Sequence, residues 1–261
     1  NYLTQFPSGS FVLEANYFSS DCYSKNKDWQ NAVKGYEYVI AQGNSRYSEN
    51  SALLLARMYY FELKNYQKAT ESFLKLKEFA TTPENELEAL RGLVRCYYQT
   101  KSFDKANATA KELLSKKGIS PDDKAIANLV LGKSLQISGS LKEAIDAFKQ
   151  VIAINKSAWG DEARYEIANC YFALSQLTQA EKSATELIKV GSTDFWIAKS
   201  YILLGDIYLK QADYFNAKAT YKSVADNATN PELKKEAQDK LENAIKEESE
   251  HSKIAPISDK K

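Results

Sequence analysis

Apolar and polar positions alternate with a helical period along nearly the whole chain, and the segment from Tyr201 to Val224 shows this layout most clearly. Each half of the segment places apolar or small residues three or four positions apart, on one helix face. These residues are Tyr201, Leu204, Gly205 and Tyr208 in the first half, and Ala217, Tyr221 and Val224 in the second. Tyr214 lies between the halves, so the pattern predicts two helices joined by a bend.

Five other segments repeat this layout at intervals of 37, 37, 38, 36 and 37 residues. The bend position is held by Trp29, Tyr66, Phe103, Leu141, Leu177 and Tyr214. Three residues later comes an invariant small side chain, at Ala32, Ala69, Ala106, Ala144, Ala180 and Ala217. A tight helix crossing needs a side chain of that size, because neighbouring helix axes approach to about 8–10 Å. Six units in phase therefore predict a repeat architecture.

The layout Y-x2-L-G-x2-Y…A-x3-Y resembles the tetratricopeptide repeat (TPR), a helix-turn-helix unit. A first-helix aromatic column supports the resemblance, with Tyr23, Tyr60, Tyr97, Leu135, Tyr171 and Tyr208 in successive units. The resemblance implies an all-α fold: a right-handed α-α superhelical solenoid of about six helix-turn-helix repeats, followed by a capping helix. It also implies a shape rather than an activity.

We expect four segments along the chain. Residues 1–10 look like the end of a preceding repeat, truncated, because Asn1 to Pro7 reads as the close of a second helix followed by a proline. Residues 11–228 hold the six repeats. Residues 229–248 form a capping helix with one apolar stripe and a charged outer face. Residues 249–261 are expected to be a disordered tail.

Helix starts follow from capping residues. Thr82-Pro83, Ser120-Pro121 and Asn230-Pro231 each read as an N-cap followed by the first helical position. Ser48 before Glu49 and Asp161 before Glu162 are expected to be two further caps.

Composition excludes several classes of function. Lys and Arg total 35 against 34 for Asp and Glu, and the net charge is +1. Because phosphate binding needs a basic face, we expect no nucleic-acid partner. No run of 18 apolar residues exists, so we expect no direct membrane insertion.

No constellation suited to catalysis, metal binding or cofactor binding is evident. Cys22, Cys96 and Cys170 are separated by two repeats each, too far apart for an intramolecular disulfide, and are expected to be small buried apolar residues. His251 is the only histidine and falls in the expected tail. Gly132-Lys133-Ser134 lacks the earlier glycine of a phosphate-binding loop. We therefore expect no enzyme, no metal site and no cofactor.

The resemblance implies a concave groove lined by one face of each first helix, where family members hold a peptide segment. Carried over by column, the expected partner-binding residues are Tyr17, Met58, Phe61, Arg91, Arg95, Tyr98, Lys133, Tyr165, Asn169 and Phe172. Arg91 and Arg95 are one helical turn apart beside Tyr98, and such a pair could hold an acidic group or a C-terminal carboxylate. The alternative is that the arginines are solvated surface charges and the apolar residues pack between repeats.

The sequence leaves two functions open. The first is a non-catalytic scaffold whose concave face binds a peptide segment of another protein, acidic or with a free C-terminus. The second is a structural spacer within a longer array, with no ligand groove of its own. Tyr17 and Asp21 stand where the carboxylate-clamp TPRs have lysine and asparagine, which argues against chaperone tails as partners.

Repeats of 36–38 residues with Phe-Pro-Ser-Gly at a unit junction resemble the TPR proteins of bacterial envelopes, especially long multi-repeat proteins of the Bacteroidetes. This resemblance implies a periplasmic or envelope location. Three cysteines without partners are the one feature that favours the cytoplasm instead.

Overall fold

The structure is a computed structural model that describes residues 2–154 and 158–254 of the chain, and within these ranges it contains helices and turns but no strand. The elements of the N-terminal half are α1 (Tyr2–Gln5), α2 (Val12–Lys25), α3 (Trp29–Ala41), α4 (Ser48–Arg57), η1 (Met58–Glu62), α5 (Tyr66–Phe79), α6 (Pro83–Gln99) and α7 (Phe103–Ser115). They continue with α8 (Pro121–Ile137), α9 (Leu141–Ile154), α10 (Ala158–Ala173), α11 (Leu177–Val190), α12 (Asp194–Lys210), α13 (Tyr214–Asn227) and α14 (Pro231–Ile254).

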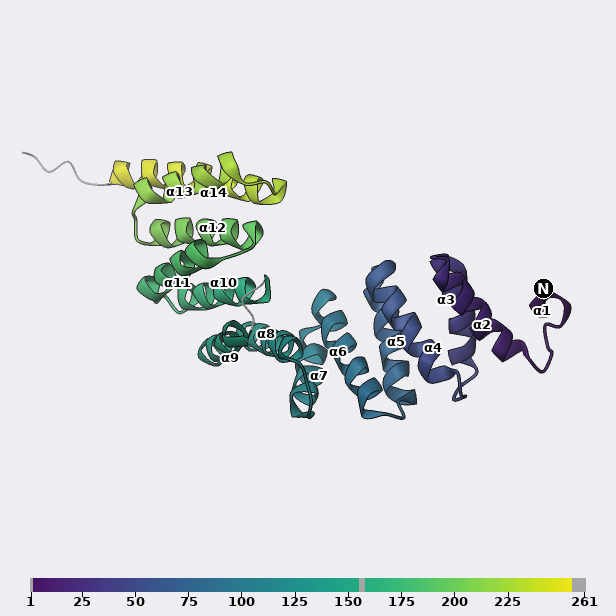
Figure 1. The fold of residues 1–261 in the computed structure, drawn as a ribbon. Coiled ribbons are helices and arrows are strands. Elements are labelled where there is room, and N and C mark those ends of the chain that lie inside the picture. Colours follow the sequence, from purple (N-terminus) through teal and green to yellow (C-terminus); the bar gives the residue numbers. More distant parts are fainter. Residues whose placement is uncertain (1, 155–157, 255–261) are drawn as a thin grey trace, which may run out of the picture. The chain divides into compact units, whose positions relative to one another are not determined.

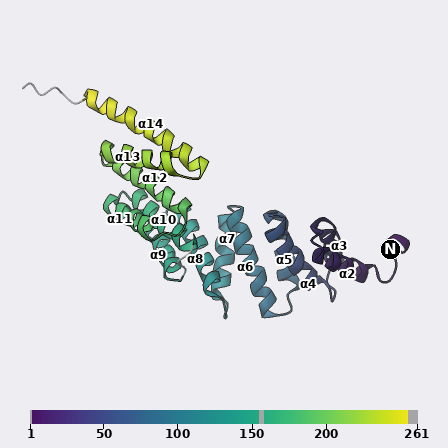
Figure 2. The same ribbon diagram turned by 45° about the horizontal axis from the view of Figure 1, so that its top comes forward.

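The chain forms two compact units, Asn1–Ser134 and Leu135–Lys261. Within the first unit, α2 pairs with α3, α4 with α5 and α6 with α7, and α3 also packs on α4 and α5 on α6 (Figure 1). Within the second unit, α10 pairs with α11 and α12 with α13, and α14 covers α13 (Figure 2). Each unit therefore has the solenoid architecture that the repeats predict.

The small-residue column lies at the helix crossings, as predicted. Every member is fully buried: Ala32, Ala69, Ala106, Ala144, Ala180 and Ala217. One turn later, four of the second helices carry a large buried ring that fills the space beside the alanine: Tyr36, Phe73, Phe148 and Tyr221. In α7 and α11 the same position is another fully buried alanine, Ala110 or Ala184. The core of each hairpin thus contains a constant alanine and, one turn later, a buried residue whose size differs between repeats.

Each bend contains one residue in the left-handed backbone region, always two positions before the second helix begins. Its φ angle is 59° at Lys27, 51° at Lys64, 55° at Lys101, 84° at Gly139, 57° at Ser175 and 59° at Ala212. Only one of the six is glycine, although a left-handed conformation costs other residues roughly 1–2 kcal/mol. Packing of the two helices must outweigh that cost, so the bend is imposed by the hairpin rather than by its own sequence.

The three predicted Pro-containing caps are confirmed. The side chain of Thr82 accepts from the Asn85 amide at 3.3 Å, and that of Ser120 from the Asp123 amide at 3.1 Å. Asn230 Oδ1 accepts from the amides of Glu232 and Leu233 at 2.9 and 3.1 Å.

The other two predicted caps are wrong. Ser48 is already the first residue of α4, and its hydroxyl donates to the Gly43 carbonyl at 2.6 Å. Asp161 is the fourth residue of α10, where its carboxylate accepts from Ser192 in the loop after α11. Both side chains make contacts with a preceding or a following loop, and these contacts are invisible to a local capping rule.

The cysteine column is buried in two of its three members. Cys96 and Cys170 are fully buried, as expected, but Cys22 is exposed, and all three thiols are free. Cys96 lies beside Thr70 of the preceding second helix α5, whereas among the described residues the helix that precedes and contacts α2 is the four-residue α1. Phe18 shows the same effect: it is 54% exposed, whereas its equivalents Leu55 and Leu203 are 1% and 4% exposed. The first repeat therefore presents an open apolar face.

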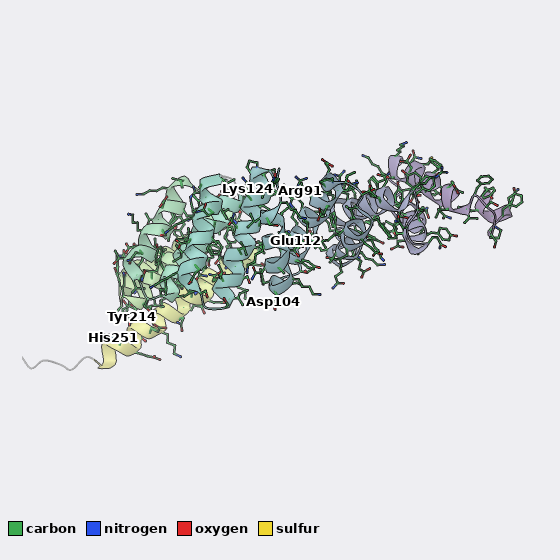
Figure 3. All side chains as sticks on the ribbon, turned by 90° about the horizontal axis from the view of Figure 1, so that it is seen from below. Arg91, Asp104, Glu112, Lys124, Tyr214 and His251 are labelled. Carbon is green, nitrogen blue, oxygen red and sulfur yellow. The ribbon has the colours of Figure 1, made fainter. Side chains whose placement is uncertain are left out.

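The last helix is longer than expected. Residues 249–254 continue α14, so the expectation of a tail starting at residue 249 is corrected there, while 255–261 lie outside the described residues. The extension has contacts of its own, because the His251 ring lies 5.8 Å from the Tyr214 ring (Figure 3). One turn earlier, Glu248 forms an ion pair with Lys218 of α13. A solvated outer face, as expected for a cap, accompanies these contacts.

The cysteine column gives a direct test of the packing. We expect Cys22 to react with an aromatic disulfide reagent in the folded protein, and Cys96 and Cys170 to react only on unfolding. Burial raises the pKa of Cys96 to about 12, which removes the thiolate that would attack the reagent. Counting released thiolate before and after adding denaturant measures this. Reaction of more than one thiol per folded chain would contradict the assigned packing.

Candidate functional site

The expected partner-binding residues lie on the first helices of both units. The first unit contributes Tyr17, Met58, Phe61, Arg91, Arg95, Tyr98 and Lys133, and the second unit contributes Tyr165, Asn169 and Phe172. Nine of these ten side chains keep solvent exposure, and the exception is Met58. The first-helix face is therefore accessible within each unit, and each unit is a separate surface.

Met58 was expected on the open face but is only 4% exposed, while Phe61 three residues later is 55% exposed. The π-turn η1 begins at Met58, and in it the Leu63 amide donates to the Met58 carbonyl at 3.0 Å. A turn closed over five residues rotates the side chains that follow it relative to an α-helix. Because Met58 is buried, it is removed from the candidate surface, and Phe61 is the most exposed aromatic residue among the expected ones.

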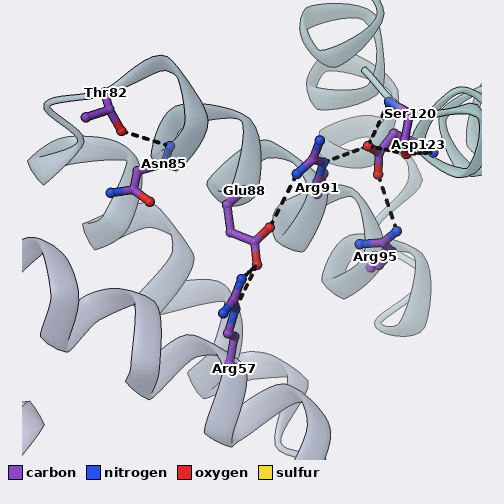
Figure 4. A network of polar contacts seen from close by, with 8 residues as sticks. All are labelled: Arg57, Thr82, Asn85, Glu88, Arg91, Arg95, Ser120 and Asp123. Carbon is purple, nitrogen blue, oxygen red and sulfur yellow. Dashed lines mark hydrogen bonds and ion pairs between the residues drawn. The ribbon is translucent and has the colours of Figure 1, made fainter. Parts of the chain in front are cut away.

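A chain of ion pairs crosses three successive first helices of the first unit (Figure 4). Arg57 of α4 donates from Nε and Nη2 to Glu88 Oε1 of α6 at 2.8 and 2.6 Å. Glu88 Oε2 lies 3.6 Å from Arg91 Nη1. Arg91 Nε donates to Asp123 Oδ2 of α8 at 2.6 Å, and Arg95 Nη2 to Asp123 Oδ1 at 3.3 Å. The chain thus links α4, α6 and the start of α8.

Asp123 changes the interpretation of the arginine pair. Its side chain is only 2% exposed, whereas those of Arg91 and Arg95 are 26% and 31% exposed. Its Oδ2 also accepts from the Ser120 hydroxyl at 2.7 Å. Because a buried carboxylate requires partners, the arginines neutralise an acid of the chain itself. A carboxylate of a partner would have to compete with Asp123 for them.

Asp123 and Glu88 were not among the expected site residues. Asp123 had a usable signal, since Ser120-Pro121-Asp122-Asp123 is a capping box in which the acid faces back toward the helix start. Its arginine partners are 28 and 32 residues earlier, so the sequence offered no route to the pairing.

Expected site residues of the second unit also form polar contacts within the chain. Glu166 is 6% exposed, and its Oε2 accepts from Gln136 Nε2 at 2.9 Å and from Asn169 Nδ2 at 3.4 Å. Asn169 is therefore engaged with a neighbour on its own helix.

The aromatic residues of the second unit are shared between core and surface. Tyr165 and Phe172 pack against the cluster around Ala168 and Leu203, and both stay partly exposed. The Tyr165 ring lies 5.3 Å from that of Trp196, and Lys210 Nζ lies 5.0 Å from the centre of the Phe172 ring. Burial raises the pKa of Tyr165 well above its ordinary value.

Metal binding and membrane insertion place their own requirements on the described residues. Within the described ranges, no group of three or more His, Cys, Asp or Glu residues is placed to hold a metal ion. None of the described helices has the length and apolar character needed to cross a membrane. What the first-helix faces offer is exposed rings beside paired charges.

Comparison with solved structures shows the same fold in several bacterial proteins. A tetratricopeptide repeat protein from Parabacteroides merdae is 18% identical, with 93% of this chain and 88% of that chain covered at a TM-score of 0.52. The pilF protein of Pseudomonas aeruginosa is 14% identical over 87% of this chain and 96% of that one, with a TM-score of 0.57. MamA from Desulfovibrio magneticus RS-1 is 13% identical over 68% and 93%, with a TM-score of 0.55.

No curated protein sequence matches the chain. Residues 198–229 match the family model described as tetratricopeptide repeat. This segment is the repeat in which the Y-x2-L-G-x2-Y…A-x3-Y layout is most complete. The matched repeat, the five others in phase with it and the solenoid fold together show that the chain has the architecture of a tetratricopeptide repeat array.

Proposed function

We propose that the protein is a non-catalytic scaffold that binds a peptide segment of a partner protein on its first-helix faces. The observation that carries this proposal is the exposure of one aromatic column. Phe61 is 55% exposed, and its column equivalents Tyr98 and Phe172 are partly exposed. Exposed rings on a rigid helix face are the side chains that most often anchor a partner.

The competing proposal is a structural spacer, in which these residues only join neighbouring repeats. Met58 supports it, since this side chain is buried, and so do Tyr165 and Phe172, which pack against the core. Phe61 supports the scaffold instead, because a residue that serves only as inter-repeat core has no reason to leave more than half of its surface in water.

In our proposal apolar contacts supply most of the binding free energy on this face, and the arginines have a secondary role. Arg91 and Arg95 already bind Asp123, so an acidic or C-terminal group of the partner would have to displace that carboxylate, which reduces its contribution to the affinity.

The location that we propose is the bacterial envelope, on the basis of the repeat length of 36–38 residues and its resemblance to envelope TPR proteins. Fractionation of cells that carry an epitope-tagged copy of the native gene tests it. Recovery of the tag with cytoplasmic markers would place the scaffold in the cytoplasm instead.

The binding proposal predicts that Phe61→Ala weakens capture of a partner from lysate of the source organism by roughly tenfold or more, because anchors of this kind contribute about 2 kcal/mol or more. Phe215 provides a matched control: it is also an exposed phenylalanine, 77% exposed, but it lies on the second helix α13. Phe215→Ala should leave capture unchanged. Quantitative mass spectrometry of the captured proteins measures both. Equal capture by the wild type and both variants would support the spacer.

The ion-pair chain predicts that Asp123→Asn lowers the free energy of unfolding by about 1–3 kcal/mol, since it leaves two guanidinium groups facing a neutral, buried amide. The arginines are partly exposed, which keeps the loss below that of a fully buried pair. Glu78→Gln is the control, because the exposed Lys75–Glu78 pair at 2.8 Å should contribute less than about 1 kcal/mol. Urea unfolding followed by circular dichroism measures both variants. Equal stability losses would contradict a structural role for Asp123.

A further inference from the structure

In most repeats a carboxylate near the start of the first helix holds the loop that follows the second helix. In the second repeat Glu49 does so: Oε1 accepts from the Thr81 amide at 2.9 Å and Oε2 from the Thr81 hydroxyl at 2.7 Å. In the fifth repeat Asp161 Oδ2 accepts from the Ser192 amide at 2.8 Å and hydroxyl at 2.9 Å. We call this contact the loop bridge.

Two further repeats form a loop bridge through an ion pair. Lys116 binds Glu86 at 2.6 Å in the third repeat, and Arg46 binds Glu14 at 3.1 Å in the first. The carboxylate is thus a regular part of the repeat, and the loop supplies the donors.

The donors form a good carboxylate site. Burial by itself would raise the pKa of Glu49, but hydrogen bonds from Thr81 and Asn85 lower it below its ordinary value. Donors that hold an anion against burial in this way are pre-organised for a carboxylate.

The sixth repeat keeps the loop donor and lacks the acid. Its loop residue Thr229 corresponds to Thr81 and Ser192, which lie 32 and 31 residues after their carboxylates. The same separations before Thr229 fall on Ile197 and Ala198, neither of which can accept a hydrogen bond through its side chain. Among the described residues no group accepts from the Thr229 amide or hydroxyl, and Thr229 is exposed.

A cavity of about 490 Å³ occupies the place of the missing bridge. Its walls come from the start of α12, the end of α13 and the start of α14, and Thr229 is one of the residues that line it. The apolar part of the wall includes Ile197, Tyr201, Val224 and Leu233. A cavity of this size is within the range of ligand sites, roughly 300–1,000 Å³.

We propose that this cavity binds the C-terminal residue of a partner chain when that residue is apolar. The terminal carboxylate accepts hydrogen bonds from the Thr229 amide and hydroxyl, in the position that Glu49 and Asp161 occupy in their own repeats. The apolar side chain fills the cavity against Ile197 and Leu233. This site is independent of the first-helix faces and of the binding proposed for them.

Asp194 is the one charged residue in the wall, and it decides between an anionic and a cationic ligand. It is the first residue of α12, where a carboxylate is stabilised by the helix dipole without any ligand. Thr229, by contrast, offers a backbone amide that only an acceptor can satisfy, and beside it a hydroxyl that can donate to the same acceptor. An anionic ligand therefore explains more of the site, and it predicts a specific sign for the effect of Asp194→Asn: tighter binding of a carboxylate, and weaker binding of a cation.

The test uses the full chain labelled with ¹⁵N and three short peptides: acetyl-Gly-Gly-Leu as the free acid, the same peptide as its amide, and acetyl-Gly-Gly-Ser as the free acid. We expect the leucine acid to shift the amide resonances of residues 194–201 and 223–233 in a saturable way. The amide peptide and the serine acid should bind about tenfold more weakly or worse, because each loses one of the two contacts.

Variants of one residue test the repeat argument. Ile197→Glu restores a loop bridge to the sixth repeat, so it should abolish binding of the leucine acid. Ile197→Met is the matched control, since it keeps the wall apolar and should retain binding. Thr229→Val should reduce the preference for acid over amide, and unchanged melting of each variant shows that the fold is intact.

Three outcomes would overturn the proposal. One is equal binding of acid and amide by the wild type, and another is undiminished binding by Ile197→Glu. The third is the absence of shifts in a wild type and Ile197→Met that melt normally. A tighter response to an acetyl-Gly-Lys amide than to the leucine acid, lost in Asp194→Asn, would identify a cation site instead. None of these results depends on Phe61 or on capture of a partner, so they leave the binding proposal for the first helices untouched.

Discussion

The close approach of the two helices in each repeat is the constraint on which the rest of the structure depends. Six alanines in one column, all fully buried, allow the crossing. A larger side chain there would push the axes apart and uncouple the ring that packs one turn later. The bends follow from this contact, because five of six place a non-glycine residue at positive φ, a local cost that only the packed hairpin can offset. Helix packing thus specifies the repeats, and the backbone conformation of each turn is a consequence of that packing.

Polar contacts then add connections that vary from repeat to repeat. Asp123 binds two arginines from the preceding first helix, and Glu49 and Asp161 hold loops, and in each case the helix pattern alone does not predict the partner. The Asp123 contact joins neighbouring repeats, the two loop contacts close single repeats, and all of them occupy charges that would otherwise be open to a partner. For that reason the candidate binding surface consists of the side chains that remain exposed and are not engaged in contacts within the chain.

Two places stand out on this basis, and they differ in kind. Phe61 is exposed within η1, the π-turn that follows α4, which is a change in one helix. The cavity near Thr229 exists because one repeat omits a contact that four others make, which is a change in the pattern itself. A departure from an internal repeat is informative, since the other copies show what the backbone requires and what it does not.

The sequence by itself determined the α-helical repeat fold, the place of each bend, the alanine crossings and three of the helix caps. All of these depend on residues a few positions apart, or on a period that repeats six times, and such patterns can be read without knowing neighbours in space. Only the tertiary structure decided that Arg91 and Arg95 are paired with Asp123, that Met58 is buried and that Cys22 is exposed. The arginine pairing depends on a residue about 30 positions away, and the exposure of Met58 and Cys22 depends on the side chains and helices packed around them. The exposure of a side chain depends on which residues surround it in space, and the periodicity of the sequence does not contain that information.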